Sequence, residues 1–417
     1  MNISPIYTPP SEDELNSRKE KLLKLMDNSK LDAFVIADPD NIFWLTNFAN
    51  YVHERPFILI LSKCGRLSFI IPKLEKMHAE SRVIGQIEYL MYEEFPYAGK
   101  GSWDLLFTAE ISKYTNVGLE ETAPQFVANL ITTKTISSEL VEVARYIKSD
   151  YEIGRIVYSS NIASKSLEKL LSMAAPGVSL LSVNSKITKL MLLQMLTDNP
   201  ESNPLATNVA AVVQPPAVSD DPHNFTNIME MDMAAGGPHV SIINGTINGY
   251  GTEVERTFFL GKVPKKAIKP YEVMMEVRGL CYELCVPGAD MHDVDFKAKE
   301  VFKKYGYAEN VVHRVGHSIG VTGHEGPFLA EGFHHEIQAG MLFTIEPGIY
   351  LEGIGGFRHS DTVLVTPDGN KNLTPVKDSL KDMTLSISAL NFSSSPAFKK
   401  KLLKTYNRYF GLNIKLE

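Results

Sequence analysis

The sequence predicts an α/β protein with two domains: a smaller N-terminal α/β domain and a larger α+β domain that contains an internal repeat. The chain has 417 residues, which is more than one hydrophobic core usually supports. Short apolar segments alternate with helical segments in its first third, and two similar helix pairs follow. We therefore place the N-terminal domain at residues 11–137, the larger domain at residues 138–385 and a basic extension at residues 386–417.

The N-terminal domain is predicted to begin with a helix. Ser11 and Glu14 have the spacing of a capping box, and apolar residues follow at helical spacing as far as Met26. The segments after this helix alternate between short buried strands and helices. The predicted strands are 32–37, 56–62 and 67–71, and the predicted helices are 73–81 and 103–113.

The larger domain is predicted to consist of two related halves. A long helix begins near Ile147, and a helix, a Pro-Gly pair and a second helix follow one another twice, 111 residues apart. In the two copies Pro-Gly ends the first helix, and Ser179 or Asp290 can cap the second. Two copies at so long a period do not make a solenoid. They indicate two α/β halves around one curved sheet.

Polar residues that can carry chemistry gather in the stretch from residue 315 to residue 363. Two apolar runs, 341–350 and 357–366, predict strands that would hold such residues rigidly. Gly316 and Gly320 allow the backbone to pass close to its neighbours. The candidate site residues of this stretch are His317, His324, Glu346 and Arg358.

A second group of candidates lies between the two helix pairs. Glu253 and Glu255 are two residues apart in a predicted strand, so both should face the same side of the sheet. Tyr250 precedes them, and His223 stands in a Pro-His-Asn segment that reads as a loop. We expect both glutamates to lie near Glu346 and the histidines.

Four motifs occur together in one order: GHSIG, then His-Glu, then TIEPGIY, then GGFRHSDTVLVT. With this order and spacing the chain resembles the pita-bread hydrolases, the family of prolidase, aminopeptidase P, methionine aminopeptidase and creatinase. The resemblance covers roughly residues 11–375. It implies a pita-bread catalytic domain with a pseudo-two-fold repeat, hydrolysis of a C–N bond, and a homodimer.

The resemblance also implies five metal ligands, Asp, Asp, His, Glu and Glu, which hold two ions in metal-dependent members. At these positions the sequence has Ile242, Glu253, His317, Glu346 and Ser360. An isoleucine cannot ligate a metal, and a serine hydroxyl replaces a carboxylate poorly. We therefore expect no cofactor. The alternative is one divalent ion such as Mn, Co or Zn, held by Glu253, His317 and Glu346.

Creatinase is the metal-independent member that the site resembles most. The segment from Tyr250 to Thr257 is similar to its YxxxLERT motif, and Arg55 matches an arginine that crosses the creatinase dimer. The resemblance thus implies catalysis by His223, His317, His324 and Glu346. It implies substrate binding by Arg55, Tyr250, Glu253, Glu255 and Arg358.

We expect a metal-independent hydrolase that cleaves a C–N bond of a small cationic substrate of the amidine or guanidino type. Such planar cations match carboxylates through two parallel hydrogen bonds, and His223 would act as general acid and base. Two alternatives remain open. One is a metal-dependent Xaa-Pro dipeptidase or aminopeptidase with a degenerate metal site, and the other is a catalytically inactive binding module.

The composition argues against several other classes of protein. A net charge of −7 gives no broad positive surface for nucleic acid. Three cysteines do not make a disulfide framework, and the first residues lack the basic and apolar regions of a signal peptide. No apolar run is long enough to cross a membrane. We expect a cytoplasmic protein that acts on a small molecule and binds neither nucleic acid nor membrane.

Overall fold

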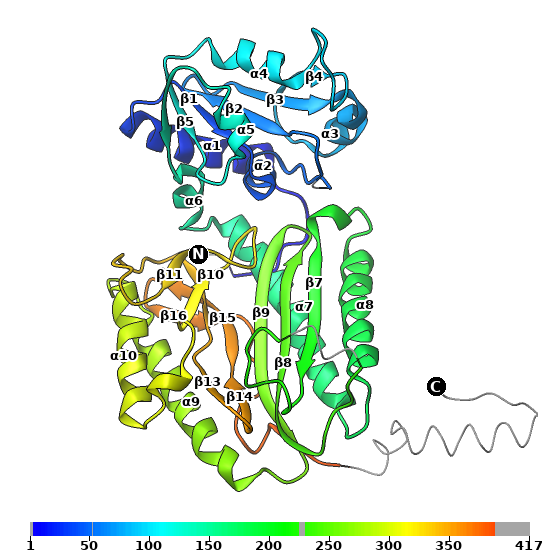
Figure 1. Cartoon of the computed structure of the whole chain (residues 1–417), viewed down its shortest axis with the longest axis vertical. Helices are drawn as coiled ribbons and strands as arrows, with labels where there is room; N and C mark the ends of the chain where they lie inside the picture. The colour runs from blue at the N-terminus through cyan, green and yellow to red at the C-terminus, as the bar shows by residue number, and fades with distance from the viewer. Residues whose placement is uncertain (1–2, 52, 225–229, 388–417) are drawn as a thin grey trace, which may run out of the picture.

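The computed structural model describes residues 3–51, 53–224 and 230–387. It contains two α/β domains, with the N-terminal domain above the larger one in Figure 1. This arrangement confirms the predicted fold class. The proposed basic extension lies, from residue 388 onward, outside the described residues.

The N-terminal domain is built on a six-stranded sheet with the order β4-β3-β2-β1-β5-β6. Its strands are β1 (Ala33–Ile36), β2 (Ile58–Ser62), β3 (Leu67–Pro72), β4 (Glu88–Tyr92), β5 (Asn116–Leu119) and β6 (Lys134–Ser137). Its helices are α1 (Glu12–Asn28), α2 (Pro39–Thr46), η1 (Lys73–Glu75), α3 (Lys76–Arg82), α4 (Trp103–Ile111) and α5 (Gln125–Ala128). All of the predicted elements of this domain are present, whereas β4, β5, β6, α2 and α5 were not predicted.

The capping box at the start of α1 is only half formed. The Ser11 hydroxyl accepts a hydrogen bond from the Glu14 backbone N–H at 3.1 Å. The Glu14 carboxylate does not return to Ser11, because it accepts hydrogen bonds from Arg18 at 2.8 Å and from the Ser149 hydroxyl at 2.6 Å. These contacts tie α1 to the start of the larger domain.

The larger domain is built on a nine-stranded sheet whose main order is β11-β10-β12-β15-β9-β8-β7, with β16 paired to β15 and β17 to β9. Its strands are β7 (Asn208–Gln214), β8 (Gly236–Ile247), β9 (Tyr250–Leu260), β10 (Gly316–Ser318), β11 (Glu325–Leu329), β12 (Leu342–Ile345), β15 (Ser360–Thr366), β16 (Gly369–Asn372) and β17 (Thr384–Leu385). A separate hairpin pairs β13 (Gly348–Leu351) with β14 (Gly355–Arg358).

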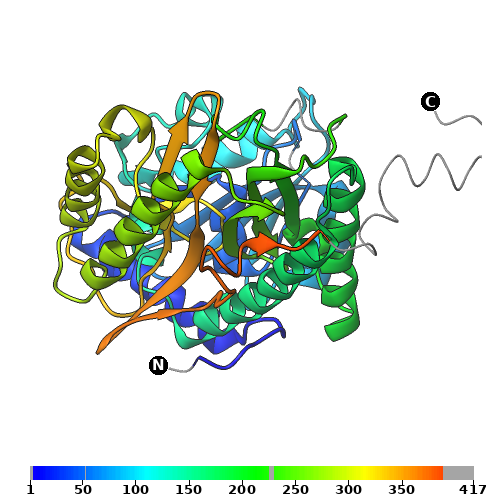
Figure 2. The same cartoon turned by 90° about the horizontal axis from the view of Figure 1, so that it is seen from below.

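Helices flank this sheet, as Figures 1 and 2 show. They are α6 (Leu140–Arg145), α7 (Asp150–Met173), α8 (Leu180–Asp198), η2 (Pro204–Ala206), α9 (Lys265–Leu284), α10 (Met291–Lys304) and η3 (Ala308–Asn310). In Figure 1 the pair α9 and α10 lies to the left of the sheet and α8 lies to its right. The main core of the domain lies between helices and sheet, where Leu167 of α7 and Val277 of α9 share one apolar cluster with Phe258 of β9.

The two helix pairs of the internal repeat end and begin as predicted. Gly177 and Gly288 have φ angles of 77° and 85°, a left-handed conformation that favours glycine after a helix. Ser179 then caps α8 and Asp290 caps α10, each by accepting a backbone N–H from the first turn. Each pair leads into strands of the nine-stranded sheet, which confirms the two-halves organisation.

Each of the two predicted strands 341–350 and 357–366 is interrupted in the middle. The first is divided into β12 and β13 at Glu346 and Pro347, and the second into β14 and β15 at His359. Pro347 has no N–H to donate to a sheet. At both interruptions the chain leaves one sheet and enters the other, because β12 and β15 belong to the large sheet whereas β13 and β14 form the hairpin. Glu346 and Arg358 therefore stand at the crossing points, where their side chains can meet those of β9.

The two domains are joined through buried polar contacts as well as apolar ones. Arg18 of α1 donates to the Trp44 carbonyl at 2.8 Å and to the Tyr250 hydroxyl at 2.9 Å. The Trp44 indole N–H donates to Glu152 of α7 at 2.7 Å. Among the residues that the structure describes, there is no helix with the length and apolar character needed to cross a membrane.

Candidate functional site

Three carboxylates meet at the centre of the large sheet. Glu253 and Glu255 of β9 lie with Glu346, at the end of β12, so that one oxygen of each is within 4.8 Å of the others. All three side chains are buried. The two-residue spacing in the strand indicated correctly that both glutamates share a face, and the break at Pro347 brings the third to them. Their roles in catalysis or binding remain predictions.

Two histidines stand beside these carboxylates. The His317 backbone N–H donates to the Thr344 hydroxyl at 3.0 Å, and its ring Nδ1 lies 3.0 Å from the Ser318 carbonyl. This leaves Nε2 directed at the acids, 3.2 Å from Glu346 Oε1 and 4.0 Å from Glu253 Oε2. The ring of the more exposed His324 stacks on His317, with centroids 3.7 Å apart and planes inclined by 19°.

The charges of this cluster shift one another's pKa values. Burial lowers the pKa of His317, but the neighbouring Glu346 and Glu253 raise it more strongly, to about 9. The pKa of Glu346, which burial raises, is held well below its usual range by His317. Burial and the charge of Glu346 raise the pKa of Glu253 to about 7. Burial and His317 lower the pKa of His324 to about 4, so its ring is neutral at pH 7.

Glu255 forms a buried ion pair with Arg358. The guanidinium donates from Nη2 to Glu255 Oε1 at 2.8 Å and from Nε to Glu255 Oε2, and Nη1 donates to the Tyr350 hydroxyl at 3.0 Å. We had expected both residues to bind the substrate and a planar cation of the substrate to pair with Glu255. In the structure Arg358 supplies that cation from within the chain, so the expected guanidino pocket is already filled.

The positions of Ile242 and Ser360 limit the donor set. Both are direct cross-strand neighbours of Glu255, Ile242 in β8 and Ser360 in β15, and both are buried. Ile242 offers no donor atom, and the Ser360 hydroxyl donates to Glu253 Oε1 at 2.7 Å. The buried His317 Nε2, in contrast, faces the Glu346 carboxylate at 3.2 Å and the Glu253 carboxylate at 4.0 Å. The residues present therefore fit one divalent ion better than two.

Potential ligand atoms come together in two overlapping groups of the described residues. One consists of Glu253, His317 and His324, and the other of Glu253, Glu255 and Glu346. The ligand set that we expected combined residues from both groups. Arg358 donates to both oxygens of Glu255, so the group that contains Glu255 is less available to a metal ion than the group with two histidines. Three protein ligands with one open position are a known arrangement for a catalytic zinc ion.

His223 lies near the histidines but on an exposed loop. Its backbone N–H donates to Asp221 Oδ1 at 3.1 Å. Its charge contributes to the lowered pKa values of His313 and His324, after burial and other neighbours, which places it on the same side of the site. The adjoining residues 225–229 lie outside the described part of the chain. Its catalytic role remains a prediction.

Two expected substrate-binding residues do not join the cluster. Arg55 donates to Glu94 at 2.7 and 3.1 Å and to Glu54 at 2.9 Å, all within the N-terminal domain. Tyr250 packs between the domains and its hydroxyl is taken by Arg18, so it acts in the domain junction. A role for Arg55 in a homodimer remains a prediction.

Sequence reasoning missed several residues around the site. His313 Nε2 lies 2.7 Å from the Tyr350 hydroxyl, which places both beside Arg358. The Lys148 ammonium, fully enclosed, donates to the Ser318 hydroxyl at 2.6 Å, directly beside His317. The guanidinium of Arg314 lies over the ring of Phe328. Their closeness to the motifs in sequence was a signal for His313, Arg314 and Tyr350, but no spacing rule pointed to Lys148.

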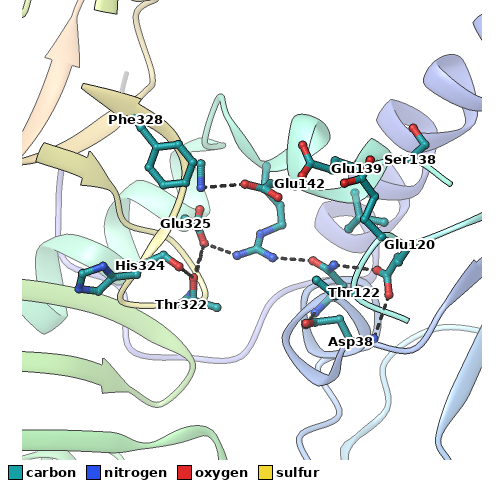
Figure 3. A pocket seen from close by; sticks show the side chains of 15 residues that line it. Asp38, Glu120, Thr122, Ser138, Glu139, Glu142, Thr322, His324, Glu325 and Phe328 are labelled. Atoms are coloured by element: carbon teal, nitrogen blue, oxygen red, sulfur yellow. Dashed lines mark hydrogen bonds and ion pairs between the residues drawn. The ribbon is translucent and has the colours of Figure 1, made fainter. Parts of the chain in front are cut away.

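A pocket of about 210 Å³ opens between the two domains next to the cluster. Figure 3 shows His324, Thr322 and Phe328 on one side of it, and Asp38 and Glu120 of the N-terminal domain on the other. Carboxylates from both domains line it, and His324 connects it to the stacked His317. A small molecule in this pocket would therefore touch the edge of the cluster.

Known proteins resemble the chain over most of its length. The Xaa-Pro dipeptidase of Pyrococcus horikoshii is 26% identical over 375 residues, which cover 88% of this chain and 99% of the relative. The crystal structure of a prolidase from Thermococcus sibiricus matches with a TM-score of 0.76 and 25% identity, covering 88% of this chain and 98% of that one. The N-terminal domain of FACT complex subunit SPT16 from chickpea (Cicer arietinum) matches in fold, with a TM-score of 0.72, 16% identity and coverage of 91% and 100%.

Two family models also match, and they correct one expectation. The creatinase/prolidase N-terminal domain matches residues 18–150, and metallopeptidase family M24 matches residues 155–367. Our expectation of a site without metal is wrong, because the family is one of metallopeptidases and the site brings three potential ligands together. The predicted enzyme class, a hydrolase of C–N bonds, is confirmed. With a match over half of its length, the chain belongs to metallopeptidase family M24.

Proposed function

We propose that the protein is a metal-dependent dipeptidase that hydrolyses the peptide bond before proline in Xaa-Pro dipeptides, with a single-ion centre. The observation that carries the proposal is the grouping of Glu253, His317 and His324, whose ligand atoms lie within 4.8 Å of one another. The similarity to Xaa-Pro dipeptidases along almost their full length supports the choice of substrate.

Glu253, His317 and His324 would hold the ion. A divalent ion bound there supplies Lewis-acid polarisation of the substrate carbonyl and activation of water. Glu346, 3.2 Å from His317, is placed to accept the proton of the attacking water. His223, on the loop at the open side of the site, would give a proton to the leaving proline nitrogen. Arg358 and Tyr350 keep Glu255 neutralised and fixed, so that it does not compete for the ion.

A second candidate function is that of a catalytically inactive binding module. The replacement of two expected ligands by Ile242 and Ser360 favours it. The paired histidines beside Glu346 favour an enzyme, because a binding surface does not need a buried imidazole whose Nε2 is directed at two carboxylates.

The test is to measure Ala-Pro hydrolysis and metal content together. We expect about one Co²⁺ or Mn²⁺ ion per chain, hydrolysis that stops on chelation and returns on adding the ion, and loss of both in Glu253→Gln and His324→Ala. His334→Ala is the matched control, because His334 is an exposed histidine paired with Asp290. A wild-type protein that neither retains metal nor cleaves any Xaa-Pro dipeptide would support the binding module instead.

A further inference from the structure

A second pocket lies between the two domains and reaches the turn that leads to His324. Its volume is about 300 Å³. Its lining comes from α2 and the loop after it, from η2 and the adjoining ends of β7 and β8, and from residues 321–323 of the turn. The candidate metal ligands are not among its lining residues. A ligand in this second pocket therefore contacts both domains without entering the candidate metal centre.

One wall of the second pocket is held in place by Phe43 of α2. The Phe43 ring packs edge to face against Tyr250, with centroids 6.3 Å apart and planes inclined by 64°. It also fills the space beside Gly249, which has a left-handed φ of 88°, and a Cβ atom on Gly249 would meet the ring at 2.1 Å. Together with Leu205 and Val321, this ring gives the pocket an apolar surface that fits a short alkyl chain.

Two hydrogen-bond acceptors in the lining have no donor. The Asp40 carboxylate makes no hydrogen bond or ion pair within the described residues. The buried amide oxygen of Asn50 also has no partner in the described part of the chain, while its amide nitrogen donates to the Tyr51 carbonyl at 3.3 Å. Because unpaired acceptors are costly when protein surrounds them, both favour a ligand that brings N–H donors.

The second pocket is also negatively charged. Among the described residues that line it, Asp40 alone carries a charge. Partial burial and the charge of Asp38 raise the pKa of Asp40 to about 6, although Arg145 lowers it. Arg145 is not available as a full partner, because it already donates to Asn41 and Glu325. Above pH 7 the Asp40 carboxylate is ionised, and a cation from outside the chain offsets its charge.

We propose that the second pocket is a separate binding site for a small primary amine, in its protonated form, with a short apolar chain. The ammonium group donates to Asp40 and Asn50. The chain lies against Phe43, Leu205 and Val321. An anion finds no cation in the described lining, and a neutral apolar molecule leaves both acceptors unpaired. The site goes beyond the proposed dipeptidase activity and does not depend on it.

Calorimetry of the whole, metal-loaded protein with n-pentylamine tests the site. At pH 8 the amine is protonated and Asp40 is ionised. The comparison ligands are 1-pentanol, which has no charge, and pentyltrimethylammonium, which has no N–H donor. We expect n-pentylamine to bind at least about tenfold more tightly than either, the scale of hydrogen bonds to charged groups. Asp40→Asn should lose this preference, and Asn50→Ala should lose part of it.

Two further variants separate this site from other acids. Asp13→Asn is the matched control, because Asp13 and Asp40 both stand in the first turn of a helix and Asp13 does not line the pocket. Glu253→Gln should keep the amine affinity. Equal binding of amine and alcohol, or an unchanged preference in Asp40→Asn, overturns the proposal. Loss of amine binding in Glu253→Gln also overturns it, because the amine then lies in the candidate metal centre.

Discussion

Arg145 and Glu325 form a buried ion pair at the junction of the two domains, with side-chain exposures of 6% and 4%. Arg145 ends α6, and its other terminal nitrogen donates to the Asn41 side chain of the N-terminal domain at 2.5 Å. Glu325 Oε2 accepts the Thr322 backbone N–H at 3.3 Å, and the Thr322 hydroxyl donates to the His324 carbonyl at 2.9 Å. These contacts, several of which are drawn in Figure 3, connect the N-terminal domain to the turn that carries His324.

Glu325→Gln should lower kcat for Ala-Pro at least tenfold, because the turn then loses its ionic anchor and His324 leaves its stack on His317. Outer partners of metal ligands typically contribute about tenfold to a hundredfold to affinity or activity. The position of His324 can be followed by ¹³C-labelled histidine NMR of the metal-free protein. Glu139→Gln is the control, because Glu139 lines the same pocket and its side chain makes no hydrogen bond among the described residues. Unmoved histidine signals with normal kcat would contradict this role.

Gly320→Ala should have the same effect as Glu325→Gln. A Cβ atom at residue 320 would lie 2.1 Å from Glu325 Oε1, so the carboxylate must move away from Lys148 and Arg145. Gly323→Ala in the same turn is the matched control, since nothing lies within 4 Å of its Cβ position. Because both substitutions act through Glu325, the double variant should be no worse than either alone. Independent, multiplying losses of kcat would show that Gly320 acts in another way.

His239 should make the folded protein less stable as the pH falls. Burial between strands lowers the pKa of His239 to about 4, whereas an unfolded histidine has a pKa of about 6.5. Below pH 6.5 the unfolded chain therefore takes up a proton that the folded chain does not, and stability is lost until the pH reaches about 4. Between pH 7 and pH 5 this corresponds to about 2 kcal/mol.

The measurement is urea unfolding of wild type and His239→Phe at both pH values. The variant should lose about 2 kcal/mol less than wild type over this range. His359, whose pKa is also lowered by burial, is present in both proteins and cancels in the comparison. Equal losses in the two proteins would show that His239 does not titrate in this way.

Arg358→Met should destabilise the fold by about 3–5 kcal/mol, because it leaves Glu255 buried without its partner. The double variant Arg358→Met with Glu255→Leu should recover most of this loss, since both charges are then gone. Lys297→Met is the control. Its pair with Asp293 is about half exposed and should contribute less than about 1 kcal/mol. Denaturant unfolding measures all three, and a double variant as unstable as Arg358→Met would contradict the explanation.

His223→Ala should reduce kcat by about a hundredfold to ten-thousandfold, the usual contribution of a general acid or base. The thermal midpoint should hardly change, because the residue lies on an exposed loop. Steady-state kinetics on Ala-Pro measure the effect, with His334→Ala as the matched histidine control. Turnover near that of wild type would remove His223 from the mechanism.

Local rules in the sequence were enough for the fold class and for part of the site. The Pro-Gly pairs with Ser179 and Asp290 after them predicted both helix pairs, because caps and turns depend on neighbouring residues only. The two-residue repeat of a strand placed Glu253 and Glu255 on one face for the same reason. These are properties of the backbone that any fold containing the segment keeps.

Tertiary structure alone decided which of these groups are free to act. Arg358 closes on Glu255 from 103 residues away, Arg18 takes the Tyr250 hydroxyl from 232 residues away, and Lys148 reaches Ser318 across 170 residues. No spacing in the sequence encodes such pairs, because they depend on which surfaces of folded elements meet. In the same way, Ile242 and Ser360 show from the sequence that two of the family's ligands are missing. Only the fold shows that the turn after β10 stacks His324 on His317, so that His324 joins Glu253 and His317 as a third potential ligand.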